Sequence, residues 1–537
     1  MLDMVPFVSL RVTTAVKGYC GLSGPPAALA SAAPRRILFQ PPITTADRKP
    51  GCVTMDLAFV DREQPRLLQE LSDFLSIPSV STLSAHEADT RRAAEWLRTE
   101  LTRLGCPVVD LIEGAGHPVV WAEGPVVPGR PTLLIYGHYD VQPPDPLEEW
   151  ESPPFVPTVR EGKLYARGAA DDKGQVFCLL KAYEAVLGED GRPPLNVHFI
   201  FEGEEESGGR VVFDLLRAEP ERTRADAVLV SDSSFFAPGL PAVYTALRGL
   251  CYAEISVRTL QRDLHSGTYG GVAPNALETL ARILSRLKSA DGEIRIPKLY
   301  KAVRKPSKKE LKAWRKLPFD EEAFLRDEVT GQGLTGLEDY SVLERTWALP
   351  TLEIHGIRGG FVGDGAKTVI PANAMAKVSL RLVPGQRYEK VSRQLERAVA
   401  RLAPPWAEVS VTHLHGGDPV EISVDHPAFG VLDDAFEEVV GRRTVPVRSG
   451  GSIPIVPELG LAGAPVILTG IGLPDDGLHS PNEKLDLAQL WTGIRVFGRF
   501  FELFAERGGT QEEASQEGTG KAEPQEGGAE QEAVETV

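Results

Sequence analysis

The segment LNVHFIFEGEEESGG (195–209) joins an apolar run to a cluster of acids. Its first seven residues are rich in β-branched and aromatic side chains and predict a buried strand. Four carboxylates follow within five residues, from Glu202, Glu204, Glu205 and Glu206. Like charges this close repel, and burying them is costly. A solvated acidic loop is the simplest interpretation. That interpretation does not explain why the four acids directly follow a buried strand, and the rest of the sequence suggests a reason.

Other short β-branched runs predict the remaining strands of a sheet, at 118–121, 132–137, 227–231 and 465–470. Amphipathic helical patterns precede them at 61–81 and 89–105, and another lies between them at 172–188. Apolar strands that alternate with helices indicate an α/β sheet covered on both faces. We therefore predict an α/β fold with one central sheet.

The pattern changes from about residue 248 to 415. Predicted strands at 251–258, 351–356, 376–384 and 408–414 combine with helices at 274–289 and 388–403. The order β-α-β-β-α-β is typical of a ferredoxin-like α+β sandwich. Because the first sheet resumes afterwards, this region is predicted to be an inserted domain. It divides the first domain into parts 55–247 and 416–505.

Length and composition set the broad class. The chain has 537 residues, enough for two or three domains, and a net charge of −17. The charge argues against nucleic acid as a partner, and the basic stretch 304–316 is predicted to be a solvated helix face because acids follow it. No run of eighteen apolar residues predicts a membrane helix. The five cysteines lack paired spacing, which favours a reducing, cytoplasmic location.

The two termini differ from the rest. Residues 1–54 lack a helical or strand period. They could be a transit peptide, but we favour a start at Met55 with an over-extended or disordered leader. Residues 508–537 contain eight Glu and one Lys without an aromatic residue. The segment 506–537 is therefore predicted to be an acidic disordered tail.

Polar clusters follow the predicted strands of the first sheet. His138 and Asp140 follow 132–137, Asp232 follows 227–231, and His479 lies in the loop after 465–470. Ligands of open α/β sheets bind at the carboxyl ends of strands, so these clusters should converge. The loop RGAADDKG (167–174) adds two more acids, although alone it could be a helix N-cap.

A pocket of two histidines and several carboxylates explains the crowded acids. Divalent cations among carboxylates reverse the electrostatic cost of crowding. Mixed imidazole and carboxylate ligands suit zinc, and also manganese or cobalt. Two ions about 3.5–4 Å apart would form a hydrolytic centre that activates water and polarises a carbonyl.

The chain resembles the dinuclear metallopeptidases of peptidase family M20, over about residues 55–504. The motifs are GHYDVQP, LYARGAADDKG, EGEEESGG, SDSS, DLHSG, KTVIPANAMAKVSLRLVP, GGSIP and DDGLHSPNEKL, in the order of the family. The branch of carnosine and cytosolic non-specific dipeptidases is the most similar. The resemblance implies a zinc-peptidase-like catalytic domain with a central mixed sheet and an inserted lid and dimerisation domain.

The resemblance also implies metal ligands, with Asp171 bridging two ions. His138 and Asp232 would complete one site, and Glu206 and His479 the other. Asp140 would orient His138 as a ligand.

Glu205 would be the general base, which takes a proton from a metal-bridging water and passes it to the leaving amine. The family pattern Glu-Gly-x-Glu-Glu-Ser-Gly places Glu204 at a position that is often apolar in dipeptidases. A slip of one residue would make Glu204 the base, and the fixed Ser-Gly argues against it.

The same resemblance implies roles for residues of the inserted domain. His265 in DLHSG would reach from the partner subunit of a homodimer to stabilise the oxyanion. Thr368 and Arg381 would hold the substrate carboxylate. Gly450, Gly451 and Ser452, which follow the inserted domain, would line the pocket with backbone and hydroxyl donors. On its own, His265 would be a loop histidine, and Arg381 a surface arginine.

The sequence thus predicts a homodimeric dinuclear metallopeptidase that hydrolyses the amide bond of dipeptides or small peptides with a free C-terminal carboxylate. An N-acyl amino acid deacylase or desuccinylase of the same fold is the nearest alternative. A non-catalytic binding protein that kept the fold is a third, but such a protein would be expected to have lost ligands or the base.

Overall fold

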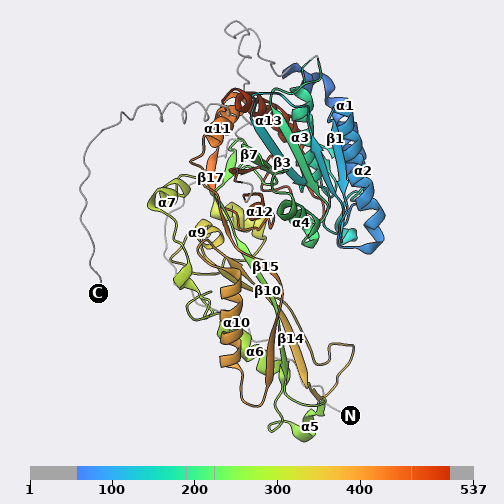
Figure 1. The fold of residues 1–537 in the computed structure, drawn as a ribbon. Coiled ribbons are helices and arrows are strands. Elements are labelled where there is room, and N and C mark those ends of the chain that lie inside the picture. The colour runs from blue at the N-terminus through green and yellow to red at the C-terminus, as the bar shows by residue number, and fades with distance from the viewer. Residues whose placement is uncertain (1–56, 189, 223, 461–462, 508–537) are drawn as a thin grey trace, which may run out of the picture. The chain divides into compact units, whose positions relative to one another are not determined.

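A six-stranded sheet forms the centre of the structure, a computed structural model that describes residues 57–188, 190–222, 224–460 and 463–507 (Figure 1). The strands are ordered β1-β2-β6-β3-β7-β18. Their bounds are β1 Val108–Ile112, β2 Val119–Glu123, β3 Thr132–His138, β6 Asn196–Glu202, β7 Ala227–Ser231 and β18 Val466–Thr469. The preferred start at Met55 and the acidic residues 508–537 lie outside the described residues.

The sheet is mixed, as predicted. β3 runs parallel to both β6 and β7, and β18 is parallel to β7, whereas β1 and β2 pair in antiparallel fashion. All five predicted strands of this sheet are confirmed. β1 was not predicted; its sequence VVDLI is a short apolar run interrupted by Asp110, which is a weak strand signal.

Both faces of the sheet are covered, because side chains alternate across each strand. On β3, Leu133 and Ile135 pack into one core and Leu134 and Tyr136 into the other. The helices of the first core are α1 Leu57–Leu75, α2 Glu87–Arg103, α3 Lys173–Ala185, α11 Pro427–Val440 and α13 Leu487–Arg507. Those of the second are α4 Val211–Ala218 and α12 Val456–Leu459.

A separate four-stranded antiparallel sheet has the order β12-β14-β10-β15. Its elements are β10 Gly249–Arg258, α6 Ala276–Leu287, β12 Thr351–Gly359, β14 Asn373–Leu382, α10 Tyr388–Leu402 and β15 Glu408–Gly417. This chain order and strand order are those of a ferredoxin-like sandwich, which confirms the predicted fold class. The division of the chain into domains at 248 and 415 remains a prediction.

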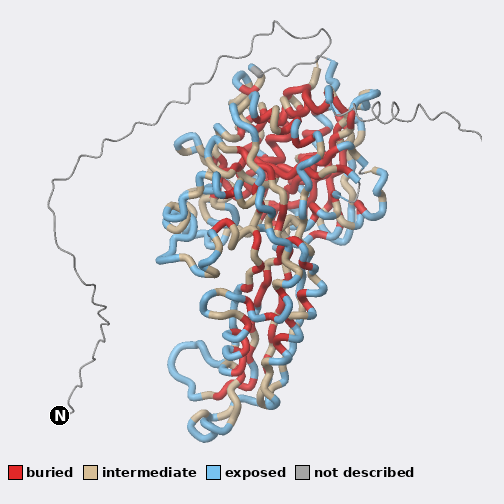
Figure 2. Tube along the Cα trace, turned by 90° about the vertical axis from the view of Figure 1, so that its left-hand side faces the viewer, coloured by how far each residue is buried: buried red, intermediate tan, exposed pale blue. Residues whose placement is uncertain are grey.

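The strand β10 shows why this sheet is two-layered. Its residues alternate between buried and partly buried along most of the strand, and Cys251, Ala253, Ile255 and Val257 face a core shared with α6 and α10. Figure 2 shows buried positions on these strands interleaved with exposed ones, whereas they gather densely in the six-stranded sheet. One face of the four-stranded sheet is therefore left open among the described residues.

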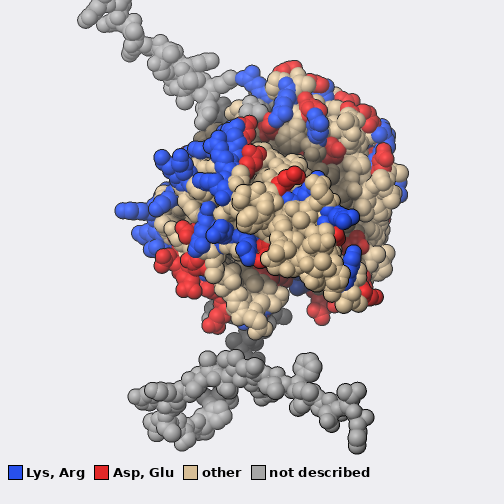
Figure 3. Space-filling view, turned by 90° about the horizontal axis from the view of Figure 1, so that it is seen from below, with Lys and Arg blue, Asp and Glu red and all other residues tan. Residues whose placement is uncertain are grey.

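The insertion between α6 and β12 contains short helices, α7 Lys308–Trp314, α8 Glu321–Ala323 and α9 Val342–Trp347. The Lys residues of α7 are exposed, as predicted for a solvated helix face. Lys and Arg side chains gather on the left-hand side of Figure 3, the side on which α7 lies in Figure 1. Within the described ranges, no helix is both long and apolar enough to cross a membrane.

Small sheets and helices complete the structure. The paired short strands are β4 Thr158–Arg160 with β5 Lys163–Tyr165 and β19 Lys484–Asp486, β8 Ala242–Tyr244 with β17 Val445–Val447, β9 Ala246–Leu247 with β16 Val420–Glu421, and β11 Leu264–His265 with β13 Val369–Ile370. α5 covers Ser266–Tyr269, and single turns lie at Ser84–His86, Leu147–Glu149, Glu205–Ser207 and Tyr300–Ala302; a π-helical segment spans Phe324–Val329.

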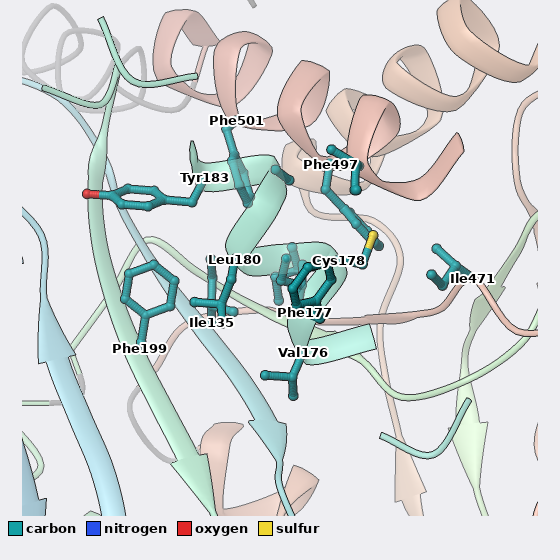
Figure 4. Close-up of a cluster of buried hydrophobic side chains, with 14 of the residues drawn as sticks. Ile135, Val176, Phe177, Cys178, Leu180, Tyr183, Phe199, Ile471, Phe497 and Phe501 are labelled. Carbon is teal, nitrogen blue, oxygen red and sulfur yellow. The ribbon is translucent and has the colours of Figure 1, made fainter. Parts of the chain in front are cut away.

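The helix α3 fixes the position of the loop that precedes it, because it is buried along almost its whole length. Figure 4 shows its side chains between Ile135 and Phe199 of the sheet and Phe497 and Phe501 of α13. Nearly every residue from Lys173 to Ala185 is buried. A helix with an apolar side against both the sheet and another helix holds its N-terminus, and hence the loop before it, in one place.

Leu180→Ala should lower the free energy of unfolding by about 2–5 kcal/mol, because it leaves a cavity in this core. Leu180 is fully buried. Urea unfolding measures the change. Leu147→Ala is the control, since Leu147 is 56% exposed and its truncation should cost within ~0.5 kcal/mol. Equal effects of the two substitutions would contradict the packing.

Candidate metal centre

Three strand ends meet at one edge of the six-stranded sheet. His138 is the last residue of β3, and the register pairs it with Glu202 at the end of β6. Asp232 directly follows β7, the other parallel neighbour of β3. Parallel strands bring their carboxyl ends to the same edge, so these residues converge as the sequence predicted.

The carboxylate of Asp171 lies between the two histidines. Its Oδ1 is 3.1 Å from His138 Nε2, and its Oδ2 is 2.9 Å from His479 Nε2. Glu206 Oε1 is 3.2 Å from the same His479 nitrogen. Two groups of possible metal ligands result, His138–Asp171–Asp232 and Asp171–Glu206–His479, with the ligand atoms of each within 4.8 Å of one another. Asp171 is common to both groups.

The electrostatics of the site fit divalent cations. Burial raises the pKa of Asp172, Glu205 and Asp232 well above the ordinary range, and neighbouring carboxylates raise it further. Asp172 Oδ1 is buried without a hydrogen-bond partner. Uncompensated acids in such a position are costly unless cations lie among them. The two ligand groups together offer three carboxylates and two imidazoles, and this donor set suits zinc, manganese or cobalt.

The histidines and the carboxylates that they contact shift one another's pKa values. Hydrogen bonds to Asp171 and Glu206 raise the pKa of His479 to about 10. Burial raises the pKa of Asp171, but the two histidines outweigh burial and hold it below its ordinary range. In each pair, an imidazole and a carboxylate compete for one proton. A divalent cation that took the place of that proton would be bound by both groups.

A third cluster of acids has a different explanation. Glu70, Glu100 and Glu184 also lie within 4.8 Å of one another. The buried ammonium of Lys181 contacts all three, and Arg103 pairs with two of them. Because cationic side chains already neutralise these acids, the cluster is a buried ion-pair network.

Asp140 joins the His138 strand to the glutamate loop. His138 Nδ1 lies 3.1 Å from the Asp140 carbonyl oxygen and 3.4 Å from its carboxylate. The same carboxylate accepts hydrogen bonds from the backbone N–H groups of Glu205 and Glu206, at 3.2 and 3.1 Å. It is fully buried. The geometry therefore suits the predicted orienting role and adds a second one, the placement of the loop that carries Glu205 and Glu206.

Four residues of the site were not predicted, although three of them occur in the quoted motifs. Gln142 Nε2 donates to Glu206 Oε2 at 2.7 Å, and Ser81 Oγ donates to Asp140 Oδ2 at 2.6 Å. Arg167 and Glu483 form a buried ion pair beside Asp171. Motif spacing gives no partner for a Gln, Arg or Glu, so only the fold could bring these groups to the ligands.

Glu204 has a structural role. Its Oε2 accepts hydrogen bonds from the backbone N–H groups of Arg210 and Val211, at 3.2 and 3.3 Å. These N–H groups lie at the start of α4 and have no partner within the helix. The departure from an apolar residue at this position is therefore explained by helix capping.

The predicted substrate residues fall into two places. Arg381 Nη1 is 3.0 Å from Ser452 Oγ, and the Ser452 hydroxyl donates to the Arg248 carbonyl. Arg248 Nε donates to the carbonyl of Gly450 at 2.8 Å, and its backbone N–H to Gly451. Arg381 and the loop 450–452 are thus brought together. Arg248 was not predicted, and no motif position indicated it.

His265 and Thr368 lie elsewhere, on the small ribbon of β11 and β13. The Thr368 carbonyl accepts a hydrogen bond from Ser266, and His265 pairs with Val369. Both residues are exposed. His265 Nδ1 accepts a hydrogen bond from the Gly267 N–H at 3.0 Å, and neither metal-ligand group includes it.

Comparison with known proteins gives the family. The sequence model of Peptidase family M20/M25/M40 matches residues 134–503. The chain belongs to this peptidase family. Cys-Gly metallodipeptidase dug1 of Schizosaccharomyces pombe is 35% identical, over 82% of this chain and 95% of its own. Beta-Ala-His dipeptidase of Homo sapiens is 30% identical, over 84% of this chain and 92% of its own.

Solved structures of the family share the fold. The crystal structure of human carnosine dipeptidase 1 matches with a TM-score of 0.75 and 29% identity, over 84% of this chain and 98% of that one. Agreement over almost the whole length of that peptidase covers both the six-stranded and the four-stranded sheets. The resemblance noted from the motifs is confirmed.

Glu204→Gln tests the register of the glutamates in this peptidase. We expect kcat within about threefold of wild type, because the amide oxygen can still cap α4. If Glu204 were the general base, kcat would instead fall by about 100- to 10,000-fold. Steady-state kinetics with a hydrolysed dipeptide distinguishes the two. Thermal unfolding of the same variant shows whether the α4 cap persists.

Proposed function

We propose that the protein is a metal-dependent dipeptidase that hydrolyses the amide bond of dipeptides or small peptides with a free C-terminal carboxylate. The observation that carries this proposal is the position of Asp171, whose two oxygens face two different histidines. One carboxylate shared by two ligand groups is the arrangement that a dinuclear centre requires. Family membership and relatives named as dipeptidases support the same conclusion.

In this proposal His138, Asp171 and Asp232 hold one divalent ion, and Asp171, Glu206 and His479 hold the second. Zinc and manganese are the proposed ions, with cobalt as an alternative. Bound ions of this kind lower the pKa of water and polarise the substrate carbonyl. The role of the protein is to hold the ligands in position, and Asp140 and Gln142 do so through the contacts described above.

Glu205 is the proposed general base. It follows Glu204 at the start of a single helical turn and is held there by its backbone N–H, which donates to Asp140. Burial raises the pKa of its carboxyl well above the ordinary range. A carboxylate with a raised pKa can take a proton from water and return it to the leaving amine. Its neighbour Glu206 points to His479, so adjacent glutamates have different roles.

Arg381 is the proposed contact of the substrate carboxylate, and Gly450, Gly451 and Ser452 line the pocket beside it. A part for Thr368, which lies on the β11–β13 ribbon, stays a prediction. Arg381 is partly buried, and burial lowers the pKa of its guanidinium. It has no carboxylate partner within ion-pair distance in the described part of the chain. A free carboxylate of the substrate would supply one. The deacylase alternative is not favoured, because the relatives matched over most of their length are named as dipeptidases.

We further propose a homodimer in which His265 acts on the active site of the partner subunit. The exposed position of His265, beside Thr368 on the β11–β13 ribbon, supports this assignment. An imidazole donor near the reacting carbonyl would stabilise the oxyanion. A cytoplasmic location remains a prediction, with which the buried, unpaired Cys106, Cys178 and Cys251 agree.

One competition assay tests the proposed activity. Protein loaded with zinc or manganese is given a mixture of dipeptides and of N-acetyl and N-succinyl amino acids, and products are followed by mass spectrometry. We expect loss of dipeptides, abolished by a chelator and restored by added metal, because the bound ions activate the water and polarise the carbonyl. Loss of acyl amino acids alone would show that the protein is a deacylase. No loss of any substrate with any metal would contradict the proposed hydrolase activity.

Subunit mixing tests the action of His265 in the partner subunit. Glu205→Gln and His265→Ala should each reduce kcat by orders of magnitude. After exchange of equal amounts of the two variants, mixed dimers hold one site with both residues intact. Random exchange should restore about a quarter of wild-type activity, since half of the dimers are mixed. No recovery in verified mixed dimers would place His265 outside the partner site.

A further inference from the structure

The carboxylate of Glu483 is held by four donors from one loop. Arg167 Nη1 donates to Oε2 at 2.7 Å, and the Gly168 N–H donates to the same oxygen at 2.9 Å. Oε1 accepts from the backbone N–H groups of Ala170 and Asp171, at 2.9 and 3.1 Å. Glu483 is fully buried. Each of its oxygens therefore fixes a different part of the turn that presents Asp171.

This turn needs external support, because it is tight and irregular. Gly168 has a φ of +85°, and a Cβ at that position would lie 2.8 Å from the side chain of Val141. A Cβ on Gly174 would lie 1.8 Å from the Ala169 carbonyl oxygen. Three backbone N–H groups of the turn have Glu483 as their acceptor, and buried N–H groups without an acceptor are unfavourable.

Glu483 also fixes the loop of His479. Only three residues lie between the two positions, and both His479 and Asn482 have positive φ values, 59° and 63°. Asn482 Nδ2 donates to the carbonyl of Glu149 at 2.8 Å, and its Oδ1 accepts from Glu151. The short, constrained segment 479–483 is therefore anchored at its C-terminal end. A shift of Glu483 would move His479 and Asp171 relative to each other.

Arg167 extends the connection to the third ligand segment. Its Nη2 donates to the Pro143 carbonyl at 3.3 Å, next to Gln142 and the segment of His138 and Asp140. Its guanidinium lies over the ring of Trp150 at 5.5 Å. Only about 1% of Arg167 is exposed. One buried ion pair consequently contacts the segments that carry His138, Asp171 and His479.

We propose that Glu483, with Arg167, is the positioning residue of the dinuclear centre, which sets Asp171 to serve both ions at once. Glu483 has no ligand atom in either metal group, so it acts through Asp171. The proposal rests on the metal centre proposed above. Groups that orient metal ligands typically contribute about 10- to 100-fold in metal affinity.

Glu483→Gln tests the proposal. The amide keeps the size of the side chain, but one of its two ends becomes a donor and can no longer accept from the turn. We expect both metal equivalents to bind about 10- to 100-fold more weakly in competition with a fluorescent chelator. Arg167→Lys keeps the charge and should cause a smaller loss. If Glu483→Gln does not fold, the metal affinity of Arg167→Lys tests the proposal in its place.

Glu100→Gln is the matched control. Glu100 is also a buried carboxylate paired with a buried cation, Lys181, but its cluster is not part of either metal group. It should lower the thermal stability of the metal-free protein without changing metal affinity. The proposal is overturned if Glu483→Gln and Arg167→Lys bind metal as wild type does, or if Glu100→Gln weakens binding equally. A wild-type protein that binds no divalent ion would overturn the metal centre itself.

Discussion

The concentration of negative charge at the carboxyl edge of the six-stranded sheet is the constraint on which the rest of the structure depends. Asp140, Asp171, Asp172 and Glu202 are buried there, with Glu205, Glu206 and Asp232 beside them. Burial and mutual repulsion would unfold such a cluster unless each charge is neutralised or hydrogen-bonded. The surrounding groups can be understood as solutions to that problem.

The solutions differ from acid to acid, and the differences define the roles. Asp140 is satisfied by a serine hydroxyl and two backbone N–H groups, so it serves as a fixed anchor. Tyr136 donates to Glu202 at 2.5 Å, yet burial still raises the pKa of Glu202 to about 8. Asp171 contacts only imidazoles through its two oxygens, and Glu205 has a raised pKa. Asp171 and Glu205, whose carboxylates accept from no backbone N–H or hydroxyl among the described residues, are the acids proposed for metal binding and proton transfer.

Rigidity of the centre comes from elements that carry no ligand. α3 is buried between the sheet and α13 and fixes the end of the Asp171 loop, while the Arg167–Glu483 pair fixes its beginning. His479 lies on a loop and is about half exposed, so the ligand group that it completes is the more open of the two. Such an arrangement leaves the His479 side of the centre exposed, whereas His138 and Asp140 on the other side are buried. The lower dielectric around buried groups strengthens their charge interactions.

The positions of the strands of the central sheet and the β-α-β-β-α-β unit could be read from the sequence alone, because hydrophobic periodicity is a local property of the chain. Motif order added a proposed set of metal ligands through the family resemblance. The sequence also indicated that His138, Asp171, Asp232 and His479 would converge, since parallel strands end at one edge. The folded structure was needed to show which oxygen of Asp171 faces which histidine, that Glu204 caps α4, and that Glu483, more than 300 residues away, holds the Asp171 turn. Those contacts depend on packing between distant segments, and a motif contains the residues without their partners.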